Sequence, residues 1–76
     1  MPTKLSFYTL CMRYQHDQKF FTEICARSGL GFFVLMKMYN NEPVTYVEAL
    51  KVLKAASSYT GVEYDLNEMD VNYLAG

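Results

Sequence analysis

The chain has 76 residues, of which 51% are apolar and 20% charged, and its net charge of −1 with only four Gly and two Pro excludes a disordered chain and indicates one packed domain. One histidine and two cysteines, Cys11 and Cys25, are too few for a four-ligand metal centre or a disulfide framework, so we expect no cofactor and small buried thiols. The apolar run at residues 31–36 is far shorter than the ~20 residues of a membrane-spanning helix, and no leader opens the chain, so we expect a cytoplasmic protein without a membrane partner.

The first two predicted helices lie in the N-terminal third. Residues 5–14 carry apolar groups at helical spacing on almost every side, which predicts a helix covered by neighbours or by a second chain. Asp17 is expected to cap the next helix. The buried stripe of that helix is predicted to be Phe20, Phe21, Ile24 and Cys25. Gly29 should end it, because glycine adopts the left-handed conformation after a helix without strain.

A third helix is predicted from Phe32 to Asn40, ending before Pro43, which cannot continue a helix. Thr45 and Glu48 have the spacing of a capping box and predict the start of a fourth helix. In that helix the expected interior residues are Val47, Leu50, Val52, Leu53 and Ala56, with Lys51 and Lys54 outside.

The C-terminal part has weaker signals. Residues 62–66 alternate between apolar and polar side chains and favour an extended segment. Asp65 is expected to cap a short last helix that carries Leu66, Met69 and Tyr73. The fold class is therefore predicted to be all-α, a compact bundle of about five short helices in a single domain over residues 1–76. Residues 1–15 would be an added N-terminal helix and residues 67–76 an acidic tail or short helix.

Two stretches indicate a family. Residues 23–30 read EICARSGL, small residues followed by Gly and an aliphatic side chain, and residues 40–55 read NNEPVTYVEALKVLKA. With Leu35 and Met38 between them as inward-facing positions, residues 21–66 resemble the lambda-repressor-like (Cro/CI, Xre-type) helix-turn-helix family. Within it they are most similar to the small antidote proteins of addiction modules. The resemblance implies a helix-turn-helix core, a DNA duplex as partner, a dimer, and transcription regulation, including autorepression.

The first hypothesis is therefore a DNA-binding regulator, and the uneven distribution of charge is consistent with it. Residues 1–54 hold all seven Lys and Arg against four acids, a net +3, whereas residues 55–76 hold four acids and no Lys or Arg. A basic front portion favours phosphate attraction, although an ordinary solvated surface has the same pattern. The predicted DNA-binding residues are Lys37, Asn40, Lys19 and Arg27.

In the family, the leading residues of the third helix contact the DNA bases, and these positions differ in this chain. They hold Gly31, Phe32, Phe33, Met36, Lys37 and Asn40, of which only Lys37 and Asn40 retain hydrogen-bonding reach. The side chains of Phe32, Phe33 and Met36 cannot pair with the donors and acceptors of a base edge. The second hypothesis is therefore a protein-interaction module on the same frame, an adaptor, antidote or inhibitor that uses these three side chains to bind a protein or a second copy. The alternative is that they are simply core. No nucleophile with a base, acid pair or Gly-rich phosphate loop stands out, so we expect neither an enzyme nor a small-molecule substrate.

Overall fold

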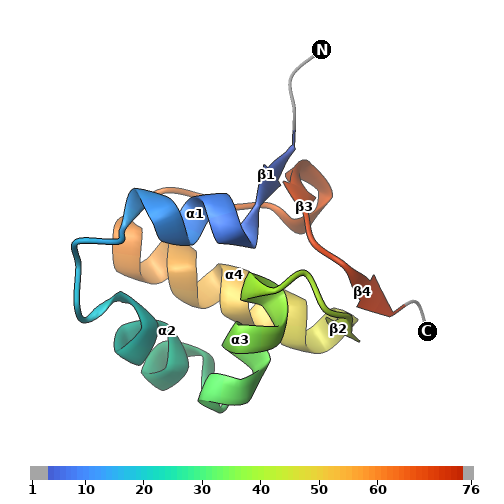
Figure 1. The fold of residues 1–76 in the computed structure, drawn as a ribbon, viewed down its shortest axis with the longest axis horizontal. Coiled ribbons are helices and arrows are strands. Elements are labelled where there is room, and N and C mark those ends of the chain that lie inside the picture. The colour runs from blue at the N-terminus through green and yellow to red at the C-terminus, as the bar shows by residue number, and fades with distance from the viewer. Residues whose placement is uncertain (1–3, 75–76) are drawn as a thin grey trace.

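The computed structural model describes residues 4–74, and over these residues the chain is mostly helical (Figure 1). Four α-helices are present in the described part: α1 (Phe7–Arg13), α2 (Phe20–Ser28), α3 (Phe32–Tyr39) and α4 (Tyr46–Thr60). A 3₁₀-helix, η1 (Leu66–Glu68), and four strands of two residues each complete it: β1 (Leu5–Ser6), β2 (Val44–Thr45), β3 (Met69–Asp70) and β4 (Tyr73–Leu74). In Figure 1, α1 and α3 pass in front of α4 and α2 lies below it, and α2 packs on α4 most extensively.

The first helix begins two residues later than predicted. Ser6 caps α1, because its hydroxyl accepts a hydrogen bond from the Thr9 N–H at 3.1 Å. The preceding pair, Leu5 and Ser6, forms β1 and is paired in parallel with Met69 and Asp70 of β3. Residues 5 and 6 therefore form a strand, although their local pattern is helical, because they pair with a segment more than sixty positions away in the sequence.

Helix α2 begins at Phe20, and the prediction that Asp17 caps it is wrong, because Lys19 occupies the cap position without a side-chain cap. Asp17 binds the turn before the helix instead, where its carboxylate accepts from the Lys19 N–H at 2.9 Å. Phe20 and Ile24 of the predicted stripe are buried. The other two, Phe21 and Cys25, are only half-buried.

The ends of α2 and α3 agree with the predictions. Gly29 ends α2 with φ of 72°, the left-handed conformation expected of it. Helix α3 runs from Phe32 to Tyr39 with Asn40 at its C-terminal cap. Asn41 follows with φ of 59°, a left-handed conformation that Asn tolerates better than most residues.

The capping box at the start of α4 is confirmed. The Glu48 N–H donates to Thr45 Oγ1 at 3.1 Å, and the Thr45 N–H donates to Glu48 Oε1 at 2.9 Å. The predicted interior is wrong in part, since Val47 is 56% exposed and Leu50 is 37% exposed. The buried side chains of α4 are Ala49, Val52, Leu53, Ala55 and Ala56. The buried side of α4 is thus rich in small alanines, and α4 packs most extensively on α2.

The last helix predicted for the tail is wrong. Asp65 does cap a helix, accepting from the Asn67 N–H at 3.0 Å, but that helix is the single 3₁₀ turn η1. The chain then continues as β3, paired in parallel with β1, and β4, paired in parallel with β2. Residues 62–65, expected to be extended, form no strand. The outermost residues of the two predicted terminal segments, 1–3 and 75–76, lie outside the described part of the chain.

The core joins all four helices to the tail. Fifteen apolar side chains are buried within residues 4–74: Phe7, Leu10, Cys11, Phe20, Ile24, Leu35, Met38, Val44, Ala49, Val52, Leu53, Ala55, Ala56, Leu66 and Met69. Because Leu66 and Met69 belong to this core, the C-terminal segment closes the bundle rather than extending from it. Among residues 4–74, no helix has the length and apolar content needed to cross a bilayer.

Candidate protein-binding face

Helix α3 presents apolar side chains to solvent. Leu35 and Met38 are buried, as predicted, and they fix the rotation of the helix. Residues 33, 36, 37 and 40 follow the i, i+3, i+4, i+7 spacing of a single helix face, which therefore lies outside. Phe33 is 78% exposed, Phe32 55% and Met36 37%, so these side chains are not core.

A row of aromatic rings extends from α3 over its neighbours. The ring centroid of Phe21 in α2 lies 5.6 Å from that of Phe32 and 6.1 Å from that of Tyr39. Tyr39 in turn lies 5.0 Å from Tyr8 in α1, which is 48% exposed. Such tilted and edge-to-face pairs are favourable arrangements for aromatic rings. We call Tyr8, Phe21, Phe32, Phe33, Met36 and Tyr39 the apolar face.

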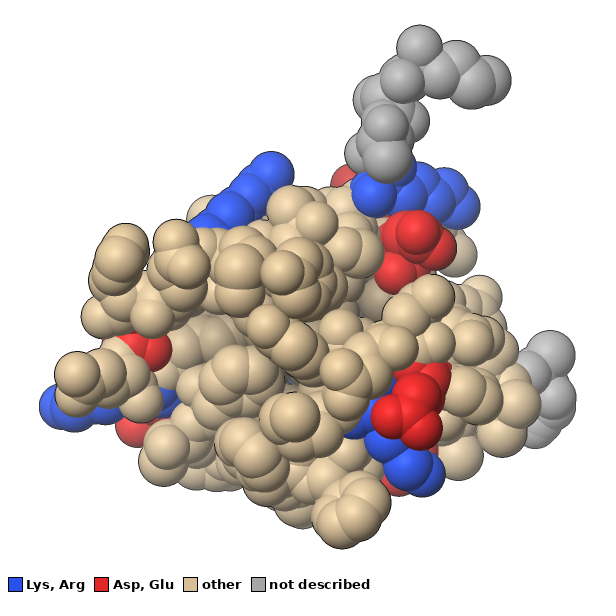
Figure 2. Space-filling view, in the orientation of Figure 1, with Lys and Arg blue, Asp and Glu red and all other residues tan. Residues whose placement is uncertain are grey.

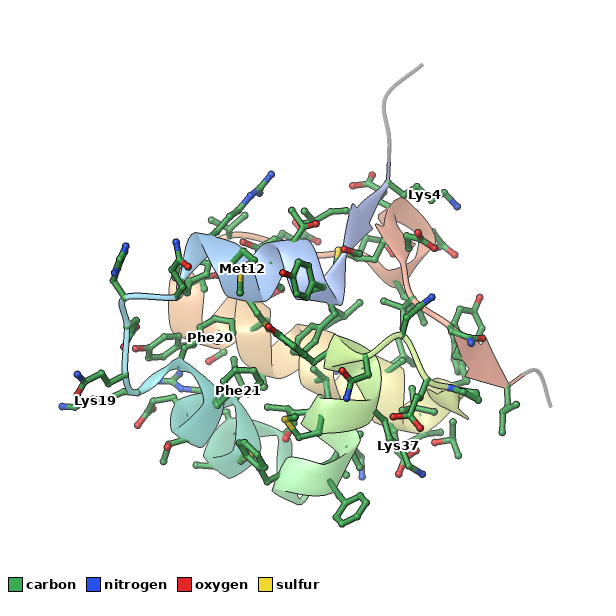
Figure 3. The ribbon with its side chains drawn as sticks, in the orientation of Figure 1. Lys4, Met12, Lys19, Phe20, Phe21 and Lys37 are labelled. Atoms are coloured by element: carbon green, nitrogen blue, oxygen red, sulfur yellow. The ribbon has the colours of Figure 1, made fainter. Side chains whose placement is uncertain are left out.

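Beside this row the surface is hollowed by a recess of about 380 Å³ between α1, α2 and α3. Its lining comes from α1 and the following loop (Cys11, Met12, Tyr14, Gln15 and Asp17), from α2 (Phe20 and Phe21) and from α3 (Met36 and Tyr39). Figure 3 shows Met12, Phe20 and Phe21 in the space between α1 and α2. The volume is within the range of pockets that bury a ligand group, and the lining is mostly apolar.

One carboxylate, Asp17, lines the recess. The Tyr59 hydroxyl of α4 donates a hydrogen bond to Asp17 Oδ2. That bond, together with the one from the Lys19 N–H, lowers the pKa of Asp17 below its ordinary value. The same bond raises the pKa of Tyr59, because ionising the phenol would remove the proton that it donates. Asp17 is therefore a carboxylate at neutral pH and joins the α1–α2 loop to α4.

Neither thiol is activated as a nucleophile. Burial raises the pKa of Cys11 to about 12, and it also raises the pKa of Cys25. A thiolate is the reactive form of cysteine, so both side chains behave as small apolar groups at neutral pH. Both are free thiols. Within residues 4–74, no three His, Cys, Asp or Glu side chains are grouped as a metal site would require.

The structure does not bring the predicted DNA-binding residues together. Lys37 and Asn40 are exposed on α3, whereas Lys19 lies before α2, at the opposite edge of the face in Figure 3. Arg27 Nε lies 3.2 Å from Glu23 Oε1, and its Nη1 donates to Ser58 of α4 at 2.7 Å. Its guanidinium also lies 5.4 Å from the centre of the Tyr59 ring. Arg27 thus links α2 to α4 and is separate from Lys37.

Charged side chains surround the apolar face rather than cross it. Figure 2 shows uncharged atoms over α1, α2 and α3, with Lys, Arg, Asp and Glu around the edges. Sequence reasoning found Phe32, Phe33 and Met36 but missed Tyr8, Phe21, Tyr39 and the recess. The available signal was the apolar character of residues 5–14 on nearly all sides, which predicted a helix covered by its neighbours or by a second chain.

Comparisons of the chain with models of protein families, with curated proteins and with solved structures found no match.

Proposed function

We propose that the chain is a small protein-interaction module, an adaptor, antidote or inhibitor, that binds a protein through the apolar face. The observation that carries this proposal is the exposure of Phe32, Phe33 and Met36 beside the recess. Large aromatic and Met side chains on a contiguous uncharged surface are typical of the centre of an interface, where a few anchors supply most of the binding energy. The role is one of binding and not of catalysis.

The polar rim is consistent with this role. Lys37, Asn40 and Gln15 are exposed next to the face or its recess. In protein interfaces a ring of polar residues commonly surrounds the apolar anchors and excludes water from them. We place this module in the cytoplasm, since free thiols such as Cys11 and Cys25 persist in a reducing compartment.

A helix-turn-helix DNA-binding regulator is the second candidate. It is favoured by the order α2, a three-residue turn over 29–31 with glycine at both ends, and α3 with Lys37 on its outer face. Phe33 and Met36, however, share that outer face and offer no hydrogen bond to a base edge beyond contact with a thymine methyl. Arg27 is held by Glu23 and Ser58, which leaves few cations for phosphates. The residues thus support protein binding better than base reading.

Site-specific photocrosslinking in the source cells tests the proposal. A benzophenone amino acid replaces Phe33 in one variant and Lys54, exposed on α4, in a matched control. We expect protein adducts that form from position 33 and not from position 54. Equal adducts at both positions, or none at 33, would overturn the proposed function.

A duplex-binding titration by fluorescence anisotropy separates the two candidates. The protein-interaction module is expected to show no binding to mixed-sequence DNA even at low salt. Binding whose logarithm falls steeply with the logarithm of salt concentration, and which Lys37→Glu weakens for all sequences, would instead establish the DNA-binding candidate.

A further inference from the structure

We propose that the protein that occupies the apolar face is a second copy of this chain, with Phe33 of each copy inserted in the recess of the other. This inference rests on the proposed function and names the partner. In a two-fold symmetric interface the same surface is used twice, so that residue i contacts residue j and j contacts i. A surface suited to this arrangement needs a protrusion and a matching hollow side by side.

Helix α3 carries the protrusion, Phe33, and part of the lining of the hollow. Phe33 is the most exposed of the large apolar side chains, at 78%. Met36, one turn later on the same side of α3, lines the recess. Two copies related by an axis near this turn bring each Phe33 toward the other copy's recess. The recess of about 380 Å³ has room for a phenyl ring, and its Phe20, Phe21 and Tyr39 rings offer edge and face contacts to that ring.

The charges near the interface complement each other under the same operation. Asp17 is the acidic side chain of the recess lining, and Lys37 is the cation on the exposed side of α3, one turn after Phe33. When Phe33 enters the recess, Lys37 approaches the rim that holds Asp17 of the other copy.

The exposed area sets the size of the interface that two copies can form. The exposed parts of Tyr8, Phe32, Phe33 and Met36 amount to about two complete large side chains, roughly 400 Å² of apolar surface. With the half-buried rings and a polar rim, this approaches but does not exceed the ~800 Å² per partner of a standard interface. Interfaces at the small end of the size range are typical of weak association, so we expect a reversible dimer and centre its test on a Kd on the order of 10–100 µM.

Sedimentation velocity on the full chain from about 10 µM to about 1 mM tests this inference. The weight-average mass should rise from 8.8 kDa towards twice that value. Phe33→Ala should weaken dimerisation at least ~10-fold, with a circular dichroism spectrum like that of the wild type. Val47→Ala is the matched control, since Val47 is 56% exposed but lies on α4 outside the apolar face. A monomeric wild type at the highest concentration, or a dimer unaffected by Phe33→Ala, would overturn the inference.

Two further readouts identify the contact itself. In a mixture of isotope-labelled and unlabelled chains, intermolecular NOEs should connect the Phe33 ring to the Met12 methyl, and a dimer with NOEs only elsewhere would refute the arrangement. Lys37→Asp should weaken the dimer more at low salt than at high salt, whereas equal dimerisation would exclude the Lys37–Asp17 approach. A strictly monomeric chain that still forms specific adducts from position 33 to another protein would reject self-association while leaving the proposed function intact.

Discussion

The orientation of α3 can be tested by truncating two side chains that lie two positions apart on it. Leu35 is fully buried, whereas Phe33 is 78% exposed. Leu35→Ala removes three buried carbon atoms, whose transfer free energy from water to the core is about 2.4 kcal/mol. The cavity left behind raises the expected loss in the free energy of unfolding to about 3–4 kcal/mol. A chain of this size has a total stability of about 4–11 kcal/mol, so this single change removes a large part of it.

Phe33→Ala, in contrast, removes a larger side chain at almost no expense of monomer stability, within about 0.5 kcal/mol, because the ring is already in contact with water. The assay is urea denaturation followed by circular dichroism, with thermal melts in parallel. Leu35→Ala should lower Tm by about 15–25 °C, and Phe33→Ala by no more than about 4 °C. The measurement is made at about 1 µM, well below the lower end of the expected Kd range, so that dimerisation contributes little.

The opposite ranking would refute the reasoning. If Phe33→Ala cost more than about 2 kcal/mol and Leu35→Ala less than about 1 kcal/mol, α3 would be rotated with its aromatic side inward. The apolar face would then not exist, and both the proposed function and the two-fold interface would lose their basis. Leu35→Met, which preserves most of the buried volume, serves as the conservative control and should cost less than about 1.5 kcal/mol.

Three other predictions concern the cap of α4, the Asp17 hydrogen bond and the thiols. Thr45→Ala should lower the free energy of unfolding, measured by urea titration, by about 1 kcal/mol, because it removes the hydroxyl of the capping box. Thr45→Ser retains the hydroxyl and should cost less than half of that. An equal loss in both variants would show that the capping box is not the cause. The pKa of Asp17 is lowered in the fold, so its contribution to stability is complete above the ordinary value of 3.8 and is lost as the pH falls through the folded-state value. Stability measured between pH 2 and 6 should therefore fall less steeply in Asp17→Asn, and NMR titration of that variant should show a lower Tyr59 pKa; identical profiles would contradict the role of the bond. Cys11, with its pKa near 12, should be alkylated by iodoacetamide at pH 8 only after unfolding, whereas half-buried Cys25 should react in the native state; mass spectrometry of the labelled peptides decides, and native labelling of Cys11 would contradict its burial.

The sequence by itself determined the end of α2, both ends of α3 and the start of α4. The capping box of Thr45 and Glu48 and the left-handed Gly29 are signals carried by residues within four positions of one another. Interactions at such short range form whenever the local backbone is helical, so they are readable without knowledge of the rest of the chain. The spacing of Leu35 and Met38 predicted correctly which side of α3 is buried, but the sequence left open whether Phe33 and Met36 are exposed or core, and the structure decided this.

Only the tertiary structure decided the remaining features, because each of them joins segments that are distant in sequence. Leu5 pairs with Met69 and Val44 with Tyr73, so two-residue strands formed where local patterns favoured helix or gave no signal. The face of α4 that is buried was decided by its packing in the bundle, chiefly against α2, which left Val47 exposed. The recess exists only because α1, α2 and α3 meet at an angle that no local pattern specifies, and side chains from three helices therefore came to surround one hollow beside Phe33.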